Sequence, residues 1–422
     1  MSSLIVNSLH LILAGLGALA IFFAARRPSF DKAFWPLVFL LSGAIGAFTL
    51  LILPPPYWFW DFKIAYWPAG EAVWRDRDTL IEIFERGVHG FVNLPIVAYL
   101  FAPFGLLPAN AAGVVYSAIG VAALGLSCRL MTQMFALDRR ASALLLFGLA
   151  AFGPISYSLR DANSSHILLA VLLLGLAAIR GGRDVLGGAL FGCAAVLKPP
   201  LLILGVLYAL RAKWKVVAGG LGVCVGAVLA SLAVFGWDVH VGWYEATIAP
   251  FAGQPVAAYN AQSIASVIAR MEAGIPGLVD WRPATLSTLG KTAVIAASAL
   301  LVMLCVAAGW RRPTAAQLET ETLIAITLVC LVSTLAWSHY FVWLAPAFVV
   351  LLQAREASRA WRWAVLAALI LAAPIEFISP WMEHGVYGPL TNLLTSHLTI
   401  AGLIVLTALA RLRHRPIDTP AA

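Results

Sequence analysis

An aspartate within a run of aromatic residues is the first candidate for acid–base chemistry in this sequence. Asp61 lies in the segment Trp58-Phe59-Trp60-Asp61-Phe62-Lys63-Ile64-Ala65-Tyr66. Partial removal from water raises the affinity of a carboxylate for a proton, which suits the group to act as a general base. The alternative is an acid at the membrane interface that pairs with Lys63.

A lysine at a break between two short apolar segments is the second candidate. Lys198 precedes Pro199-Pro200, and the apolar segments 185–197 and 200–211 flank it. At 1.5 Å per residue each segment is only about 20 Å long, so Lys198 is expected below the outer surface. A discontinuous helix that carries a cation at membrane depth is where a buried anionic headgroup would bind.

Other polar residues are expected at the outer ends of membrane spans. His339 lies at a tight turn in Trp337-Ser338-His339-Tyr340. A histidine at membrane depth is uncommon without a partner, although a satisfied structural histidine is the alternative. A second group precedes another span, and helix capping and snorkelling are its alternative explanation. This group consists of Arg160, Asp161, Asn163 and His166.

Two loop segments offer further candidates. The segment Tyr259-Asn260-Ala261-Gln262-Ser263 presents amides and hydroxyls that suit sugar hydroxyls, though such residues also cap helices. The triplet Asp76-Arg77-Asp78 has the acid-x-acid spacing of divalent-cation sites, but its alternating charges favour a solvated turn. We therefore predict no metal. The five cysteines occur singly in apolar segments and favour packing roles.

The elements that must position these residues are membrane-spanning helices. The 422 residues are 61% hydrophobic and 11% charged, and the mean hydropathy is +0.89. Soluble domains are about 45–50% apolar. Apolar runs long enough to cross a hydrocarbon core of about 30 Å recur along the chain. The sequence therefore predicts an all-α integral membrane protein, with residues 1–422 forming one polytopic domain.

Charge indicates the topology of these spans. The net charge is +8, but the basic residues form short clusters between apolar runs, which argues against nucleic-acid binding. By the positive-inside rule these clusters face the cytoplasm, the N-terminus lies outside and the C-terminus inside. The expected spans are 4–24, 33–53, 109–133, 141–158, 164–179, 185–197, 200–211, 216–235, 287–309, 321–337, 340–353, 363–379 and 390–411.

The unequal loops place the chemistry on the non-cytoplasmic side. The cytoplasmic connections are too short for a nucleotide-binding domain. The two long loops, 54–108 and 236–286, both face outside. Within the first, 64–74 has the spacing of a helix that lies in the membrane interface, and 94–107 is expected to be a juxtamembrane or re-entrant element.

Four stretches in this order resemble the bacterial polyprenyl-phosphate-mannose-dependent α-mannosyltransferases, which are glycosyltransferase family 87 of the GT-C superfamily. The stretches are Asp61-Phe62-Lys63-Ile64-Ala65-Tyr66 with Ala69-Gly70-Glu71-Ala72-Val73, Asn93-Leu94-Pro95 through Leu107-Pro108, Gly187-Gly188-Ala189 through Leu197-Lys198-Pro199, and Trp337-Ser338-His339-Tyr340 with Val342-Trp343-Leu344. Asn260 with Gln262-Ser263 is similar to an Asn-Gln-Ser element with one residue inserted.

Two departures from the family pattern concern the substrates. The family commonly has Gly-Gln-x-Asn before a span, where this chain has Asn163-Ser164-Ser165-His166. Leu94 also replaces the first proline of a Pro-Pro pair. The sugar or the acceptor can therefore differ from those of mannosyl transfer.

The resemblance implies a GT-C-type bundle of about 12–13 helices with interfacial helices in the first external loop. It implies an inverting enzyme, a hexosyltransferase that moves a sugar, above all mannose, from a polyprenyl-phosphate donor to a glycolipid or polysaccharide acceptor. Asp61 would be the general base. The residues that would hold the donor phosphate and the substrates are Lys198, His339, Arg160, His166, Lys63, Tyr66, Asn260 and Gln262.

The resemblance also bears on cofactors, partners and location. No cofactor is expected, and the partners would be the lipid-linked donor, the acceptor and membrane lipids, without nucleic acid. The protein would be a multi-pass protein of the bacterial inner membrane, with its site facing the periplasm.

Two other functions fit the same features. A flippase or transporter for a lipid-linked sugar would explain the many spans and the break at Lys198, but transporters usually carry internal repeats, and this sequence shows none. A polysaccharide ligase or polymerase would also use large external loops, and it would take a polyprenyl diphosphate oligosaccharide as donor.

Overall fold

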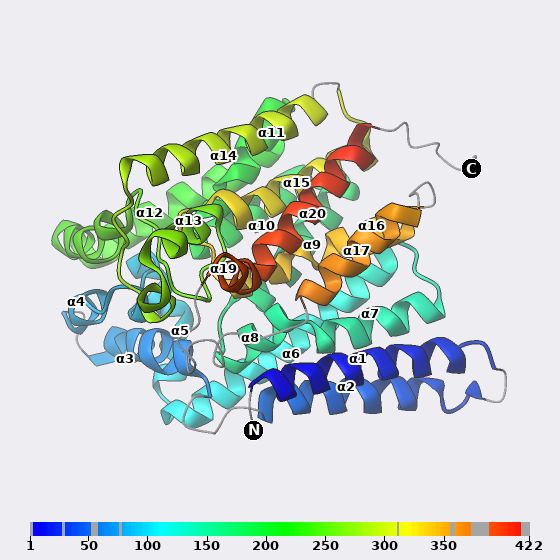
Figure 1. Ribbon diagram of the computed structural model, residues 1–422. Coiled ribbons are helices and arrows are strands. Elements are labelled where there is room, and N and C mark those ends of the chain that lie inside the picture. Colours follow the sequence, from blue (N-terminus) through cyan, green and yellow to red (C-terminus); the bar gives the residue numbers. More distant parts are fainter. Residues whose placement is uncertain are drawn as a thin grey trace.

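The described part of the protein is an all-helical bundle. The computed structural model describes residues 3–27, 30–51, 58–75, 78–309, 312–354, 359–372 and 388–414. Within these residues the only extended pairings are two isolated bridges. Figure 1 shows long helices running side by side, with α3, α4 and α13 at one end of the bundle. The prediction of an all-α polytopic membrane protein is confirmed.

The chain order of the helices gives the frame for the site. The first half contains α1 (Ser3–Ala24), α2 (Phe34–Leu51), η3 (Phe62–Tyr66), α3 (Trp67–Arg75), α4 (Thr79–Phe84), η4 (Gly87–His89), η5 (Pro95–Val97), α5 (Ala98–Gly105), α6 (Ala109–Met134), α7 (Arg139–Ala151), α8 (Gly153–Arg160), α9 (Ser165–Arg180), α10 (Asp184–Leu197), η6 (Pro199–Leu202) and α11 (Ile203–Leu210). The second half contains α12 (Trp214–Trp243), η7 (Tyr244–Ile248), η8 (Ala249–Phe251), α13 (Ile264–Ala273), η9 (Ile275–Val279), α14 (Thr288–Ala308), α15 (Ala315–Val332), η10 (Ser338–Leu344), α16 (Ala345–Gln353), α17 (Arg359–Ala372), α19 (Pro389–Thr395) and α20 (His397–His414).

Several of these helices have the length and composition of membrane spans. Four of the described helices qualify alone, namely α6, α12, α14 and α15, and the bent pair α7–α8 makes a fifth if it is one span. Shorter apolar helices such as α9 and α10 lie beside them. Because a bilayer core offers no hydrogen-bond partners, a helix is the natural way for such a segment to satisfy its backbone.

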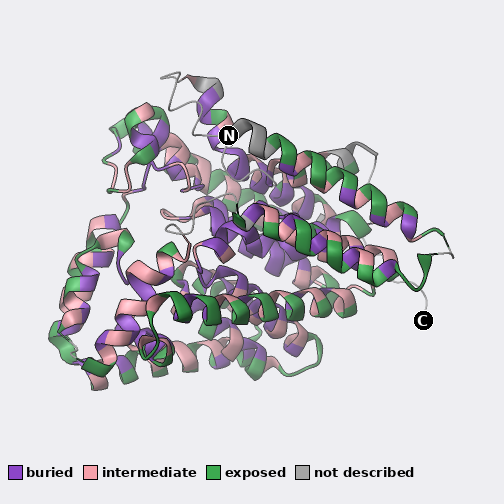
Figure 2. Ribbon diagram, turned by 90° about the horizontal axis from the view of Figure 1, so that it is seen from below, coloured by how far each residue is buried: buried purple, intermediate pink, exposed green. Residues whose placement is uncertain are grey.

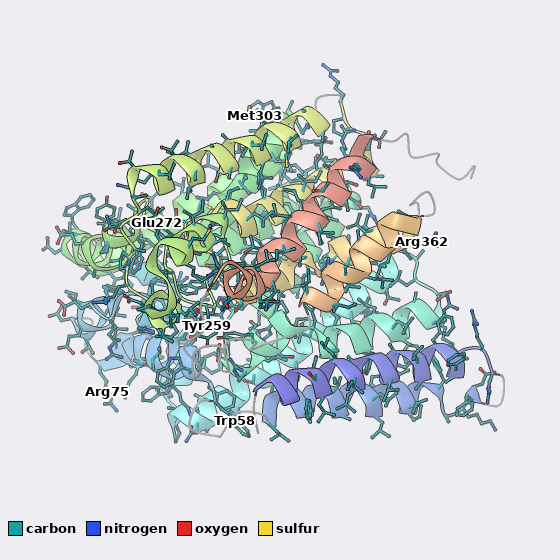
Figure 3. All side chains as sticks on the ribbon, viewed as in Figure 1. Trp58, Arg75, Tyr259, Glu272, Met303 and Arg362 are labelled. Atoms are coloured by element: carbon teal, nitrogen blue, oxygen red, sulfur yellow. The ribbon has the colours of Figure 1, made fainter. Side chains whose placement is uncertain are left out.

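The helices differ in how far they are buried. In the most apolar window of α15, 72% of the residues are buried, against 6% in α14. Met303 on α14 is 60% exposed and points away from the bundle (Figure 3). Figure 2 shows buried residues concentrated in the centre and exposed residues along the outer helices. Large apolar side chains on the outer face are expected where lipid is the solvent.

Three expected spans have different geometry. The span 141–158 is broken at Phe152 and bent by 52°, because Pro154 lacks the N–H that a continuous helix requires. The span 216–235 continues to Trp243 through a kink at Gly236, whose φ is 75°. The span 390–411 is interrupted at Ser396, between α19 and α20. Of the span 363–379, the part after residue 372 lies outside the described residues.

The first long loop forms helices that pack tightly against one another. The predicted helix 64–74 is present as η3 followed by α3, and α5 packs on α3. A Cβ added to Gly70 would lie 2.2 Å from the carbonyl oxygen of Phe101, so only glycine permits this approach. The indole N–H of Trp74 donates to the carbonyl of Ala102 over 2.6 Å. This pair of helices supports the segment that carries Asp61.

Candidate active site

A cavity of about 470 Å³ lies between the two long loops and the ends of α8, α10 and α15. Its size falls in the range of roughly 300–1,000 Å³ typical of small-molecule sites. Six of the residues singled out from the sequence line it, namely Asp61, Tyr66, Arg160, Lys198, Asn260 and His339. These residues are spread over 279 positions of the chain, from 61 to 339, so the fold brings them together.

The backbone around Asp61 is fixed by an unusual turn. Phe59 has φ of 61°, a left-handed conformation that costs a non-glycine residue roughly 1–2 kcal/mol. The N–H of Phe59 donates to the carbonyl of Arg160 over 2.7 Å, and the N–H of Phe62 donates to Asp161 over 3.2 Å. Asp61 then immediately precedes the π-helix η3, an element that occurs frequently at functional sites.

The carboxylate of Asp61 is held by Asn163. Nδ2 of Asn163 donates to Oδ2 of Asp61 over 2.8 Å. Burial raises the pKa of Asp61 above its ordinary value, while the Asn163 hydrogen bond and the positive charges of Lys198, His89 and Arg160 act in the opposite direction. The net rise makes this carboxylate a stronger base than one in water. Tyr66, one turn further on, stacks on Phe101 at 4.6 Å and closes the apolar side.

Lys198 lies at the predicted helix break. The α10 helix ends at Leu197, and Lys198 has non-helical φ and ψ of −138° and 88°. The side chain of Asn93 caps this end by donating to the carbonyl of Leu197 over 2.7 Å. The Nζ atom lies 5.0 Å from the ring centroid of Tyr340, and no carboxylate of the described chain lies within 4 Å of it. A buried cation without an adjacent counter-ion attracts an anionic ligand.

His339 reaches the cavity from η10, which is tied to the second long loop. The N–H of Ser338 donates to the carbonyl of Asn260 over 2.7 Å, and Ala261 pairs with Trp337. Within the described part of the chain, Nε2 of His339 is buried and has no hydrogen-bond partner. This nitrogen is therefore available to a ligand in the cavity.

Arg160 lies in the same wall at the end of α8. Its Nε contacts Oδ1 of Asp161 at 3.4 Å, and its guanidinium lies 4.3 Å from the ring centroid of Tyr157. The side chain is only 7% exposed. With Lys198 it gives the cavity two buried cations.

Two residues predicted from the sequence do not line the cavity. His166 is buried between helices, where Nδ1 bonds to the hydroxyl of Ser158 at 2.8 Å and the ring packs on Gly120 of α6. Lys63 places its Nζ 5.6 Å from the ring centroid of Phe59. Residues two apart on a helix point in different directions, so Lys63 does not share the direction of Asp61.

Gln262 also lies outside the cavity, in a structural position. Its Nε2 donates to the carbonyls of Tyr259 and Thr395, each at 2.7 Å, and its backbone carbonyl accepts from the hydroxyl of Thr399 at 2.7 Å. These bonds tie the second long loop to α19 and α20. Gln262 therefore supports Asn260 and does not reach the cavity itself.

Sequence reasoning missed several aromatic residues of the cavity wall. These are Trp60, His89, Tyr157, Tyr259, Trp281 and Trp337. They come from loops and helix ends, where neither periodicity nor a motif marks them. An excess of aromatic residues in both external loops was the available signal.

The possible metal site lies mostly outside the described residues, because Asp76 and Arg77 fall in a gap and only Asp78 is described. Elsewhere in the described ranges no group of three or more His, Cys, Asp or Glu residues is arranged to hold a metal ion. The absence of a metal stays a prediction.

Comparison with known proteins identifies the class as a membrane glycosyltransferase. The sequence model of glycosyltransferase family 87 matches residues 91–337. Because this match covers more than half of the chain, the protein belongs to that family. Arg160, Lys198 and Asn260 lie inside the matched range, whereas Asp61 and His339 lie outside it.

Two curated relatives have the same description. The chain is 26% identical over 298 residues to a polyprenol-phosphate-mannose-dependent alpha-(1-2)-phosphatidylinositol pentamannoside mannosyltransferase of Mycolicibacterium smegmatis, and the alignment covers 69% of each chain. It is 26% identical over 301 residues to the protein of that description from Mycobacterium tuberculosis, covering 69% of this chain and 66% of the relative. No solved structure matches the chain significantly.

Proposed function

We propose that this protein is a mannosyltransferase that moves a sugar from a polyprenyl-phosphate donor to a lipid-linked or polysaccharide acceptor, with Asp61 as the general base. The supporting observation is that Asp61 and the buried Lys198 line one cavity. A base and a cation on one cavity are the two groups that displacement of a phosphate leaving group requires.

The chemistry follows from the donor. In a sugar linked through phosphate to a polyprenol, the leaving group is an acidic phosphate, which departs without a proton from the enzyme. The acceptor hydroxyl oxygen attacks the anomeric carbon, the bond from this carbon to the phosphate oxygen breaks, and Asp61 takes the hydroxyl proton. A single displacement of this kind inverts the anomeric configuration.

The cations would stabilise the departing phosphate. Lys198 and Arg160 line the cavity as buried positive charges, and Nε2 of His339 can donate or accept a hydrogen bond there. Electrostatic stabilisation is stronger in a site shielded from water, and one such group contributes about 10²–10³ in rate. The exposed apolar faces of the surrounding helices would contact the prenyl chain.

The choice of mannose and of a lipid-phosphate donor rests on the relatives, whose names state dependence on polyprenol-phosphate-mannose. The proposed orientation, with the cavity on the periplasmic side of a bacterial inner membrane, rests on charge. Arg362 of a basic cluster lies at the opposite end of the molecule from Arg75 and Glu272 of the long loops (Figure 3). Basic ends favour the cytoplasm.

The test is transfer by the purified protein in lipid. Polyprenyl-phosphate mannose is offered with a glycolipid acceptor, and the anomeric configuration of the product is determined by NMR. We expect a mannosylated product of opposite configuration to the donor. Transfer only from a polyprenyl diphosphate oligosaccharide would indicate a ligase or polymerase. Movement of labelled lipid across proteoliposomes without a new glycosidic bond would overturn the proposal.

A further inference from the structure

One wall of the cavity is aromatic and comes from both long loops. Trp281 lies at its centre, with His89 at 5.7 Å and Tyr259 at 6.1 Å between ring centroids. All three residues line the cavity that contains Asp61. The wall is thus part of the site, although the proposed displacement gives it no role.

The wall is held rigidly. Trp281 packs with Trp337 on a small apolar cluster that includes the buried Val256 and Phe251. A Cβ added to Gly90 would lie 1.9 Å from the carbonyl oxygen of Ile83, so only glycine can follow His89 in this turn. A preorganised aromatic surface is what an adaptable ligand requires for tight binding.

The polar groups of this wall are aligned as hydrogen-bond donors. Nε1 of Trp281 donates to Oδ1 of Asn260 over 3.0 Å. Because an indole nitrogen can only donate, this bond fixes the amide orientation and directs the NH₂ group of Asn260 elsewhere. An aromatic face beside an amide donor matches a pyranose ring, whose C–H bonds pack on the ring while its hydroxyls accept hydrogen bonds.

Charge and position separate this wall from the donor phosphate. Trp281, Asn260 and Tyr259 are neutral, whereas the cavity's buried cations are Lys198 and Arg160. Lys198 lies at the break between two apolar helices, where a lipid tail can follow the phosphate. The aromatic wall belongs to the loops and faces the route of a water-exposed acceptor.

From this division we infer that Trp281, His89 and Asn260 form a subsite for a neutral sugar ring of the acceptor. The inference rests on the proposed function and adds to it the class of acceptor, because the end that reacts is then a sugar and not a bare lipid alcohol. Trp281 supplies the stacking face and Asn260 supplies hydrogen bonds to ring hydroxyls.

The test begins with binding, which needs no turnover. Saturation-transfer NMR is recorded with methyl α-mannopyranoside on the full-length protein and on Trp281→Ala, Trp281→Phe and Asn260→Ala. The expected result is sugar signal with wild type and Trp281→Phe, and at least about tenfold weaker binding for Trp281→Ala. Trp237→Ala, which removes an indole that is 71% exposed and outside the cavity, is the matched control and should bind normally.

Kinetics then separates the acceptor from the donor. With dodecyl α-mannopyranoside as acceptor, Trp281→Ala and Asn260→Ala should raise the acceptor KM and leave the KM for polyprenyl-phosphate mannose unchanged. An increase in the donor KM alone would overturn the inference, because the wall would then hold the donor sugar. Asn260→Ala keeps the ring in place and provides the measurement if Trp281→Ala does not fold.

The two proposals fail in different ways. If wild type transfers mannose and both variants keep the wild-type acceptor KM, the subsite is wrong and the proposed function stands. If wild type binds methyl α-mannopyranoside through Trp281 but transfers nothing from any lipid-linked mannose, the proposed function is wrong and the sugar site stands. Absence of sugar binding by wild type in both assays overturns the subsite.

Discussion

Asn163 donates a hydrogen bond from Nδ2 to Oδ2 of Asp61 over 2.8 Å, and its own Oδ1 accepts from the amide and the hydroxyl of Ser165 at 3.1 and 3.0 Å. These bonds from Ser165 fix the amide orientation, so the NH₂ group must face the carboxylate. The start of α9 thereby orients a carboxylate that belongs to the first long loop.

Replacing Asn163 with alanine should change the pH dependence of the reaction. The hydrogen bond favours the charged form of Asp61 and lowers its pKa, so its loss raises that pKa. The acid limb of kcat/KM should therefore move to higher pH, and transfer at neutral pH should fall about tenfold or more. Asn260→Ala is the matched control, since its amide bonds to Trp281. An acid limb at the wild-type pH would exclude the positioning role.

Replacing Lys198 with methionine should weaken use of the donor. The variant removes a buried cation from the cavity, so we expect transfer to fall by about 10²–10³, with part of the activity restored in Lys198→Arg. Loss of the positive charge also raises the pKa of Asp61, which moves the acid limb in the same direction as Asn163→Ala. Steady-state kinetics with polyprenyl-phosphate mannose measures both effects.

Lys291 provides the control for this variant, because it is an exposed lysine at the start of α14. Lys291→Met should keep the wild-type donor KM. Equal losses in both variants would indicate that only general surface charge matters.

The local features of the site could be predicted from sequence, whereas its loop-built wall could not. Lys198 was predictable because Pro199 and Pro200 cannot continue α10. Asp61 was predictable because aromatic neighbours indicate desolvation. Trp281 could not be predicted, since its place depends on how a loop folds back through contacts far apart in sequence.

Adjacent positions on one segment also misled the sequence analysis. Asn260 and Gln262 carry similar amides two residues apart, yet only Asn260 reaches the cavity, because Gln262 bonds to the backbone of Tyr259 and Thr395. Phe152 shows the same limit for the fold. The pair Gly153-Pro154 signals a new helix, but hydropathy alone treats 141–158 as one span.

Chelation should leave activity unchanged. The leaving phosphate would be stabilised by Lys198 and Arg160, so the chemistry as proposed has no step that needs a divalent cation. Transfer is measured with excess EDTA and again after addition of Mg²⁺ or Mn²⁺. Loss of activity that a metal restores would return Asp76 and Asp78 to consideration as ligands.

A buried ion cluster far from the cavity should determine stability more than activity. Glu321 on α15 accepts from Arg211 at 2.7 Å and from Arg413 of α20 at 2.8 Å, and it is 4% exposed. Glu321→Gln removes the charge that both arginines contact and should lower the free energy of unfolding by about 3–5 kcal/mol. The measurement is the thermal unfolding midpoint in detergent.

Glu319→Gln is the control for this variant. Glu319 contacts Arg180 at 2.6 Å, but the two side chains are 22% and 41% exposed, so solvent screens the pair. Its loss should cost about 0–1 kcal/mol. Similar losses of stability in both variants would contradict the importance of burial.

The measurement that tests the proposed mechanism most directly is the turnover of Asp61→Asn with polyprenyl-phosphate mannose. Asparagine keeps the shape of the side chain but cannot take the acceptor proton, so kcat should fall by about 10²–10⁴ while the donor still binds. Asp238→Asn, an exposed carboxylate on α12 outside the cavity, should keep wild-type turnover. Turnover of Asp61→Asn near that of the wild type would contradict the assignment of Asp61 as the base.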